Sequence, residues 1–147
     1  MKKLVFSLFL SLCAAGFASA AAFADRPISV EQLPAAAQKF IQTHFASTEV
    51  LYAKIDDGLF SNEYKVVFAG GVSVEFTGDG EWKEVDTKYG EVPAAIVPEA
   101  IRKQVARQFP NARIESIDRD RRGYDVGLSN GLDLEFDRQF NLVDIDD

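Results

Sequence analysis

The sequence predicts an α+β fold of two tandem repeats, each a helix followed by four antiparallel strands (α-β-β-β-β). Three observations support this prediction. Residues 28–86 and 92–147 match each other at apolar and glycine positions, each segment opens with a helical apolar stripe, and each continues with alternating strands. Self-similarity over some 50 residues is typical of a duplicated structural unit. We expect each helix to pack on one face of an antiparallel sheet.

Each repeat opens with an amphipathic helix. Apolar residues recur every three or four positions over residues 33–45 and again over residues 97–109, which is the spacing of one buried helical face. The second stripe is followed by Pro110, which ends a helix. Phe45 and Phe109 hold the same place in the two stripes, so we expect both to be buried and to contribute similarly to stability.

The strands follow with period-two alternation of apolar and polar residues. Glycine-containing turns at 69–71 and 129–131 join two of them as hairpins in each repeat. The apolar face is expected to lie under the helix, and the polar face to stay in water. We predict that this open face binds a partner through the following residues: Glu63, Lys65, Glu75, Asp125, Asp133, Glu135 and Asp137.

Residues 1–20 have the features of a signal peptide. Lys2-Lys3 precede an apolar stretch over residues 4–12, and Ala18-Ser19-Ala20 offers a cleavage site, with cleavage after residue 24 as the alternative. The single cysteine, Cys13, lies inside this segment, so the exported chain has no disulfide. We expect the protein in the periplasm, with secretion or the cell surface as alternatives, and no membrane attachment after signal removal.

The charge balance excludes some classes of partner. The net charge is −7, and removal of Lys2 and Lys3 takes it to −9. Nucleic acids and anionic lipids must be met by positive charge, so neither is expected as a partner. The remaining expectation is an exported protein, and the sequence does not indicate an oligomeric state.

No catalytic or cofactor motif is present. The only histidine is His44, on the flank of the first helix, and no nucleophile–base, phosphate-loop or zinc motif occurs. We therefore predict no catalytic residues, no cofactor and no enzymatic activity. Asp133, Glu135 and Asp137 alternate along one strand, but calcium needs six to eight oxygens at one point. Calcium or small-ligand binding remains the alternative function, with no metal ligands assigned.

Three aromatic residues have no aromatic counterpart in the other repeat. Tyr52, Phe60 and Tyr89 lie near turns or in the linker. Because aromatic side chains are enriched at interaction hot spots, we treat them as candidate contacts. Ordinary loop packing is the alternative.

The repeated motif resembles the PepSY-like, beta-lactamase-inhibitor-like family of exported bacterial proteins. The stretches that carry the resemblance are Leu33-Pro34, Ile41 to Phe45, Tyr64 to Val66, Val72 to Phe76 and Trp82 to Asp86, with their second copies at Val97-Pro98, Val105 to Phe109, Tyr124 to Val126, Leu132 to Phe136 and Leu142 to Asp146. The resemblance implies helices on antiparallel sheets and an open face that binds an exported enzyme, in an inhibitor-like or chaperone-like role. The chain departs from the motif at Leu142, which replaces Trp82, and at the glycine-free turn after Phe136.

Overall fold

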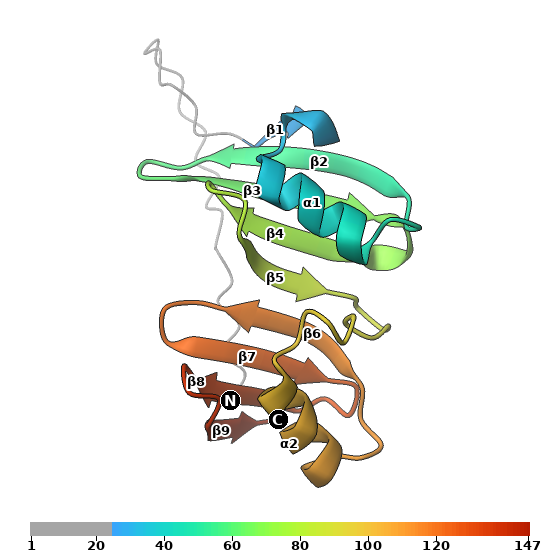
Figure 1. The fold of residues 1–147 in the computed structure, drawn as a ribbon, viewed down its shortest axis with the longest axis vertical. Helices are drawn as coiled ribbons and strands as arrows, with labels where there is room; N and C mark the ends of the chain where they lie inside the picture. Colours follow the sequence, from blue (N-terminus) through green and yellow to red (C-terminus); the bar gives the residue numbers. More distant parts are fainter. Residues whose placement is uncertain (1–24) are drawn as a thin grey trace, which may run out of the picture.

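A computed structural model describes residues 25–147, and these form one antiparallel sheet with two helices (Figure 1). The nine strands of the described chain lie side by side in sequence order, from β1 to β9. The predicted signal peptide, with either cleavage site, lies outside the described residues. Within residues 25–147, no helix is long and apolar enough to span a membrane.

The first half of the sheet contains β1 (Asp25–Ile28), the 3-10 helix η1 (Val30–Gln32), α1 (Ala35–His44), β2 (Val50–Asp57), β3 (Asn62–Phe68), the 3-10 turn η2 (Ala69–Gly71), β4 (Ser73–Thr77) and β5 (Trp82–Asp86). The second half contains α2 (Glu99–Gln108), β6 (Ile114–Arg119), β7 (Gly123–Leu128), β8 (Asp133–Asp137) and β9 (Leu142–Asp146). The order of one helix and four strands therefore occurs twice. β1 precedes the first helix and was not expected from the sequence.

Both helices cover the same face of the sheet (Figure 1). Ala37 and Ile41 form the buried side of α1, and Ile101 and Val105 form that of α2. They join one hydrophobic cluster with the inward residues of the strands, and Val92 and Ile96 of the connection between the halves belong to the same cluster. The core is thus continuous beneath both helices, and the opposite face of the sheet is left open.

The two halves meet at the β5–β6 ladder. Glu84, Val85 and Asp86 pair with Asp118, Ile117 and Ser116, and the Thr87 N–H extends the joint by donating to the Glu115 carbonyl at 2.9 Å. Val85 and Ile117 are fully buried at this joint. The sequence left open whether the two sheets are continuous, and the structure shows that they are.

The two phenylalanines that end the helical stripes are not equivalent, and the expectation that both are buried is wrong for Phe109. Phe45 is buried and stacks on Phe68 of β3, with 5.1 Å between ring centroids. Phe109 is only partly buried. In the second half, Leu128 takes the place that Phe68 holds in the first, so Phe109 has no aromatic ring to stack on there.

Candidate binding face

The ladder pairing places one row of acidic side chains across the open face. Glu75 sits between the buried residues Val74 and Phe76, and Glu135 between Leu134 and Phe136, so both point away from the helices. Direct cross-strand partners lie on the same face of a sheet. Each member is the direct cross-strand partner of the next. We call the following six residues the carboxylate row: Glu75, Glu84, Asp118, Asp125, Glu135 and Asp144.

On the side toward β1, the line of cross-strand partners continues from the carboxylate row with two lysines. Lys65 lies opposite Glu75, and Lys54 lies opposite Lys65. The Lys65 ammonium donates to Glu75 Oε1 at 3.1 Å, and Lys54 pairs with Asp25. Within the part of the chain that the structure describes, Glu75 is the one member of the carboxylate row that takes part in an ion pair. The other five carboxylates face like charges on neighbouring strands.

This crowding shifts the protonation of the row. Burial, followed by repulsion from Asp118 and Glu75, raises the pKa of Glu84 from 4.5 to about 7. Burial and repulsion from Asp125 raise the pKa of Asp118 to about 6, and burial and Glu135 raise the pKa of Asp125. Asp118 is more exposed to solvent than Glu84, so Glu84 is the carboxyl group on which we base predictions about pH.

The neighbouring carboxylates favour the charged form of Lys65. Burial opposes its charged form, but the hydrogen bond to Glu75 and the charges of Glu75 and Glu84 outweigh burial, so the pKa of Lys65 is raised. The lysine therefore stays positive and compensates the first acid of the row. No lysine or arginine forms an ion pair with Asp125, Glu135 or Asp144 among residues 25–147, and the charge of Arg122, which is paired with Asp120, only partly offsets the repulsion at Asp125.

The predicted open-face residues fall into two groups. Glu75, Asp125 and Glu135 belong to the carboxylate row, and Asp133 lies on the same face opposite Asp146. Glu63 and Lys65 instead form ion pairs, with Lys83 and Glu75 respectively.

Asp137, the last of the predicted open-face residues, caps the turn between β8 and β9. Its carboxylate accepts hydrogen bonds from the backbone N–H groups of Gln139 and Asn141 and from the Asn141 side chain. These bonds lower the pKa of Asp137. They close the glycine-free β8–β9 turn, so this carboxylate stabilises local structure.

Sequence reasoning missed Glu84, Asp118 and Asp144. Glu84 and Asp118 each adjoin a fully buried residue, Val85 and Ile117 respectively, and this alternation was the signal available. Asp144 has no such signal, because Val143 and Ile145 on either side of it are exposed. Their alignment also depends on which strands of the two halves pair. It depends further on register shifts at Glu75/Phe76 and Glu135/Phe136, which composition does not reveal.

The row is not a preformed metal cage. Among the described residues, no three histidine, cysteine or acidic side chains are arranged to hold one metal ion. Neighbouring strands are about 4.8 Å apart, so the six carboxylates form a line in which each adjacent pair can share a cation. Water would have to supply the remaining ligands of such an ion.

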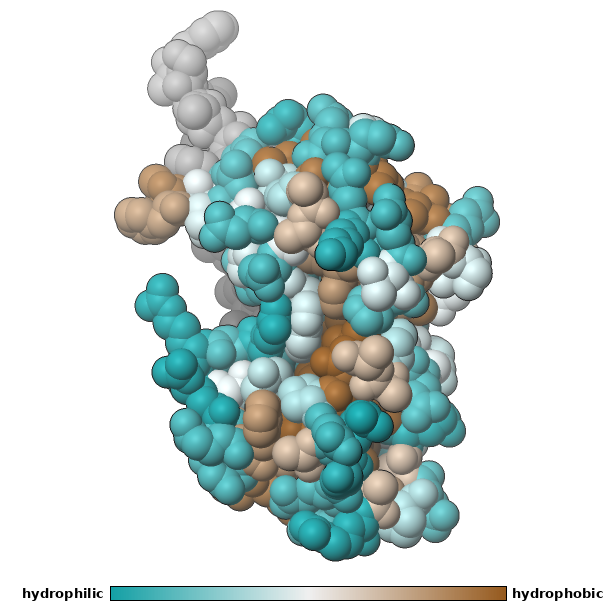
Figure 2. Space-filling model, viewed as in Figure 1, coloured by the Kyte–Doolittle hydropathy of each residue, from teal (hydrophilic) through white to brown (hydrophobic). Residues whose placement is uncertain are grey.

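The three candidate aromatic contacts are exposed but come from separate segments. Tyr52 lies on β2, Phe60 on the β2–β3 hairpin, and Tyr89 in the connection after β5. Phe60 is 98% exposed, and with Leu59 it gives the hairpin an apolar tip that projects from the molecule (Figure 2). The structure does not gather the three aromatics into one surface.

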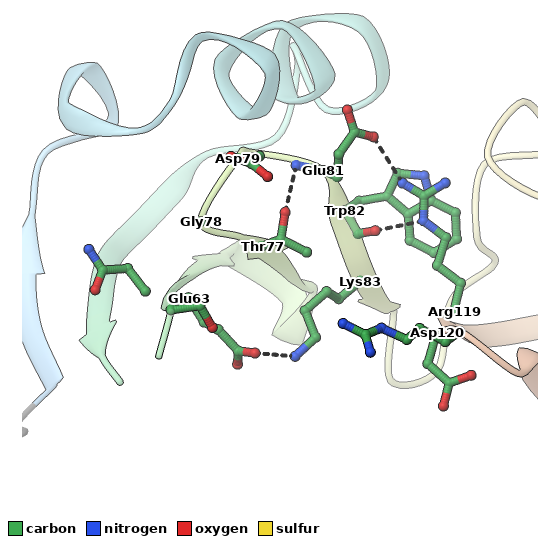
Figure 3. Close-up of a pocket in the computed structure, with 12 residues that line it drawn as sticks. Glu63, Thr77, Gly78, Asp79, Glu81, Trp82, Lys83, Arg119 and Asp120 are labelled. Atoms are coloured by element: carbon green, nitrogen blue, oxygen red, sulfur yellow. Dashed lines mark hydrogen bonds and ion pairs between the residues drawn. The ribbon is translucent and has the colours of Figure 1, made fainter. Parts of the chain in front are cut away.

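A groove of about 960 Å³ lies at one end of β3–β6 (Figure 3). Four of its charged groups form two ion pairs. Arg119 lies over the Trp82 ring at 4.0 Å, donates through Nε to the Trp82 carbonyl at 2.7 Å and pairs with Glu81 at 3.2 Å. Lys83 pairs with Glu63 at 2.6 Å. We interpret these contacts as a bracket between β5 and β6.

Comparison with known proteins places the chain in a family. Residues 62–144 match the family described as "Putative beta-lactamase-inhibitor-like, PepSY-like". This span begins in β3 and ends in β9, so it crosses from the first half of the sheet into the second. A comparison with curated proteins gave no match.

Three solved structures are similar over 84% of this chain. One is a "putative periplasmic protein from DUF2874 family" of Bacteroides vulgatus, with 48% identity, 97% of its own chain covered and a TM-score of 0.81. A "putative calcium-regulated periplasmic protein" of Bacteroides thetaiotaomicron has 46% identity, 97% coverage and a TM-score of 0.82. A further periplasmic protein of unknown function from Bacteroides vulgatus has 36% identity, 100% coverage and a TM-score of 0.80. The chain belongs to the PepSY-like family.

Proposed function

We propose that this protein is a non-enzymatic, calcium-responsive binding protein of the periplasm, and that the carboxylate row is its cation site. The observation that carries the proposal is the direct opposition of six carboxylates on six neighbouring strands. Within residues 25–147, only the first of them, Glu75, forms an ion pair. The periplasmic setting is supported by the three similar structures, each described as periplasmic.

The row is costly to the fold unless something neutralises it. Like charges directly opposite on neighbouring strands are destabilising, on the scale of about 0.2–1 kcal/mol for a pair. Five such pairings follow one another from Glu75 to Asp144. Local choices that oppose stability are expected mainly at functional sites. A bound cation would turn each repulsive pairing into a bridge.

The chemistry of the row fits calcium better than magnesium. Calcium accepts six to eight oxygens in flexible geometry, whereas magnesium demands a near-ideal octahedron and gives up its waters reluctantly. An exposed line of carboxylates provides oxygens without fixed geometry. A relative with 46% identity is described as calcium-regulated. Because water must complete each site, we expect a dissociation constant in the range of extracellular calcium modules, about 0.1–1 mM.

Calorimetric titration with calcium chloride tests the proposal. The test variant replaces three row members by amides (Glu84→Gln, Asp118→Asn and Asp125→Asn). The matched control makes the same loss of charge at three exposed acids outside the row (Glu31→Gln, Glu91→Gln and Glu99→Gln). We expect saturable binding by the native protein and the control, and at least tenfold weaker binding by the test variant. Equal binding by the two variants would place calcium elsewhere.

The second candidate function is recognition of an exported protein by the open face, in the inhibitor-like role that the family description suggests or in a chaperone-like role. Leu51 and Tyr52 on β2, together with the apolar hairpin tip at Leu59 and Phe60, are exposed large apolar residues that favour it. A pull-down from periplasmic extract checks this function, using a variant with Glu75, Asp133 and Glu135 changed to lysine. A protein that the native chain and this variant enrich equally would not be bound through the open face.

We further propose that the two halves are tandem copies of one α-β-β-β-β unit. Corresponding register shifts support this. The β2–β3 ladder shifts between Val50 and Tyr52, and the β6–β7 ladder shifts between Ile114 and Ser116. Matching shifts occur in the β4–β5 and β8–β9 ladders. Bulges tend to be kept within a family, so two matched pairs favour duplication over independent origin.

A further inference from the structure

The outer edge of β9 is an unfilled pairing position. β9 takes the place beside β8 that β5 takes beside β4, with the register shift at Glu135/Phe136 in one ladder and at Glu75/Phe76 in the other. β5 is followed in the sheet by β6, whereas no described strand lies beyond β9 (Figure 1). An exposed edge of this kind is a template for another strand.

Comparison of equivalent residues in β5 and β9 shows which side chains a further strand would cover. Val85 of β5 is 0% exposed beside β6, and its counterpart Ile145 of β9 is 46% exposed. Val143 of the same strand is 56% exposed. A strand added at β9 would therefore bury apolar surface that the β5–β6 joint already buries in the other half.

The backbone at this edge also lacks a strand partner. At the filled edge, the Thr87 N–H donates to the Glu115 carbonyl at 2.9 Å, in line with the pairing of Val85 and Ile117. At β9, the Ile145 N–H donates at 3.0 Å to the carboxylate of its neighbour Asp144. A backbone carbonyl from an incoming strand could take over this donor and release the Asp144 side chain.

The negative charge around the β9 edge favours an incoming strand with basic side chains. Asp144 and Asp146 lie opposite Glu135 and Asp133, so the open-face side of the edge is strongly negative. A second copy of β9 would place aspartates against aspartates, which is destabilising. The other edge of the sheet is less suitable, because β1 is four residues long and contains Pro27, which has no N–H to donate.

We propose that the β9 edge docks an extended segment of a partner protein in which lysine or arginine alternates with β-branched apolar residues. The segment would extend the sheet by strand addition, with main-chain hydrogen bonds supplying affinity and alternate side chains supplying specificity. Its basic side chains would meet Asp144 and Asp146, and its apolar side chains would cover Ile145. This inference does not rest on calcium binding, but Asp144 belongs to both sites, so the experiments below are made in calcium-free buffer.

Fluorescence anisotropy with a labelled peptide, Lys-Val-Lys-Thr-Lys-Val-Lys, tests the proposal. Its matched control is the same peptide N-methylated at alternate residues, which keeps every charge but cannot form one edge of a ladder. We expect the control to bind at least tenfold more weakly. We expect Ile145→Lys to weaken binding of the parent peptide by a similar factor. Glu31→Gln, an exposed position at the β1 end of the sheet, should leave binding within twofold. Equal binding of the two peptides would reduce the interaction to charge attraction and overturn the proposal, as would no binding at all.

Hydrogen exchange locates the peptide and separates the other occupants. The proposal predicts slower exchange of the Ile145 amide and of its neighbours in β9 when the peptide is bound. Protection confined to β1 or to the open face would contradict it. Sedimentation of the protein without peptide tests whether a second copy of the chain occupies the edge. A concentration-dependent dimer with β9 protected would assign the edge to a second copy of the chain instead.

Discussion

Glu84 and Asp118 face each other directly across the β5–β6 ladder, the joint where the two helix-covered halves of the sheet meet. Both carboxyl groups have raised pKa values, about 7 for Glu84 and about 6 for Asp118, with burial as the first cause and facing carboxylates as the second. The strands on each side therefore join at a point where charge opposes pairing. Protons and cations should both strengthen this joint.

The pH dependence of stability follows from Glu84. Its folded-state pKa of about 7 lies above its ordinary value of 4.5, so the folded protein binds more protons than the unfolded chain between these values. The stabilisation from this group is complete below about pH 4.5 and is lost as pH rises through about 7.

Because Asp120 and Asp137 have lowered pKa values and change stability with pH in the opposite sense, the useful quantity is the difference in stability between variants. Thermal denaturation should show Glu84→Gln gaining on the native protein as pH rises from 5 to 8, while Gln42→Ala, at an exposed position that does not titrate, keeps a constant offset. A constant offset for Glu84→Gln too would refute this pKa assignment.

Phe45 and Phe109 should differ in their contribution to stability. Phe45→Ala removes a buried ring stacked on Phe68 and should cost about 3–5 kcal/mol. Phe109→Ala removes a partly buried ring and should cost about 1–2 kcal/mol. The exposed positions Gln42 and Arg107 should tolerate alanine within about 0.5 kcal/mol. Urea denaturation measures all four, and equal losses at the two phenylalanines would contradict the packing described.

Gly123 is required by close backbone approach. A Cβ at this position would lie 1.9 Å from the Phe136 carbonyl oxygen of β8, whereas at Gly131, with a φ of +86°, nothing lies within 4 Å. Gly131→Ala should cost about 1 kcal/mol from the unfavourable φ alone. Gly123→Ala forces β7 and β8 apart and should cost clearly more, or prevent folding. A smaller loss at Gly123 than at Gly131, measured by chemical denaturation, would show that this ladder is looser than the structure indicates.

The bracket formed by Arg119 and Trp82 should be visible by fluorescence, because Trp82 is the only tryptophan. Arg119→Ala exposes the indole and should shift its emission to longer wavelength, with a loss of about 1–2 kcal/mol in stability. Arg119→Lys keeps the charge but not the planar group that lies over the ring and donates to the Trp82 carbonyl, so it should rescue little. Arg121→Ala, in the loop that follows β6, is the control. An unchanged emission spectrum in Arg119→Ala would rule out the bracket.

The helices and strands were predictable because their signals are local. The apolar stripe from Leu33 to Phe45 and the alternation around Val74 and Phe76 each depend on near neighbours in the sequence. β1 was missed because it is only four residues long, and Arg26 and Pro27 give it no alternation. The unequal burial of Phe45 and Phe109 depends on the strand residue beneath each ring, which the helical pattern does not include.

The candidate site was predicted only in part, for a physical reason. Glu75, Asp125 and Glu135 were found from alternation within their own strands. Glu84 and Asp118 join them in one row only because β5 pairs with β6. This pairing is a long-range contact, and the sequence is equally compatible with two halves that form separate sheets. The sequence identified acidic residues on one face, but their order along one line came from the ladder registers.

The central claim is that the carboxylate row binds calcium, and carbon-13 NMR of the side-chain carboxyl groups during a calcium titration at pH 8 tests it most directly. We predict saturable shifts at Glu84, Asp118, Asp125, Glu135 and Asp144, with Glu31, Glu91 and Glu99 unmoved by comparison. Magnesium chloride at equal ionic strength should produce smaller shifts, since magnesium keeps its waters. Small shifts that rise together at all acidic residues without saturating would mean that calcium only screens the surface charge, and would contradict the account.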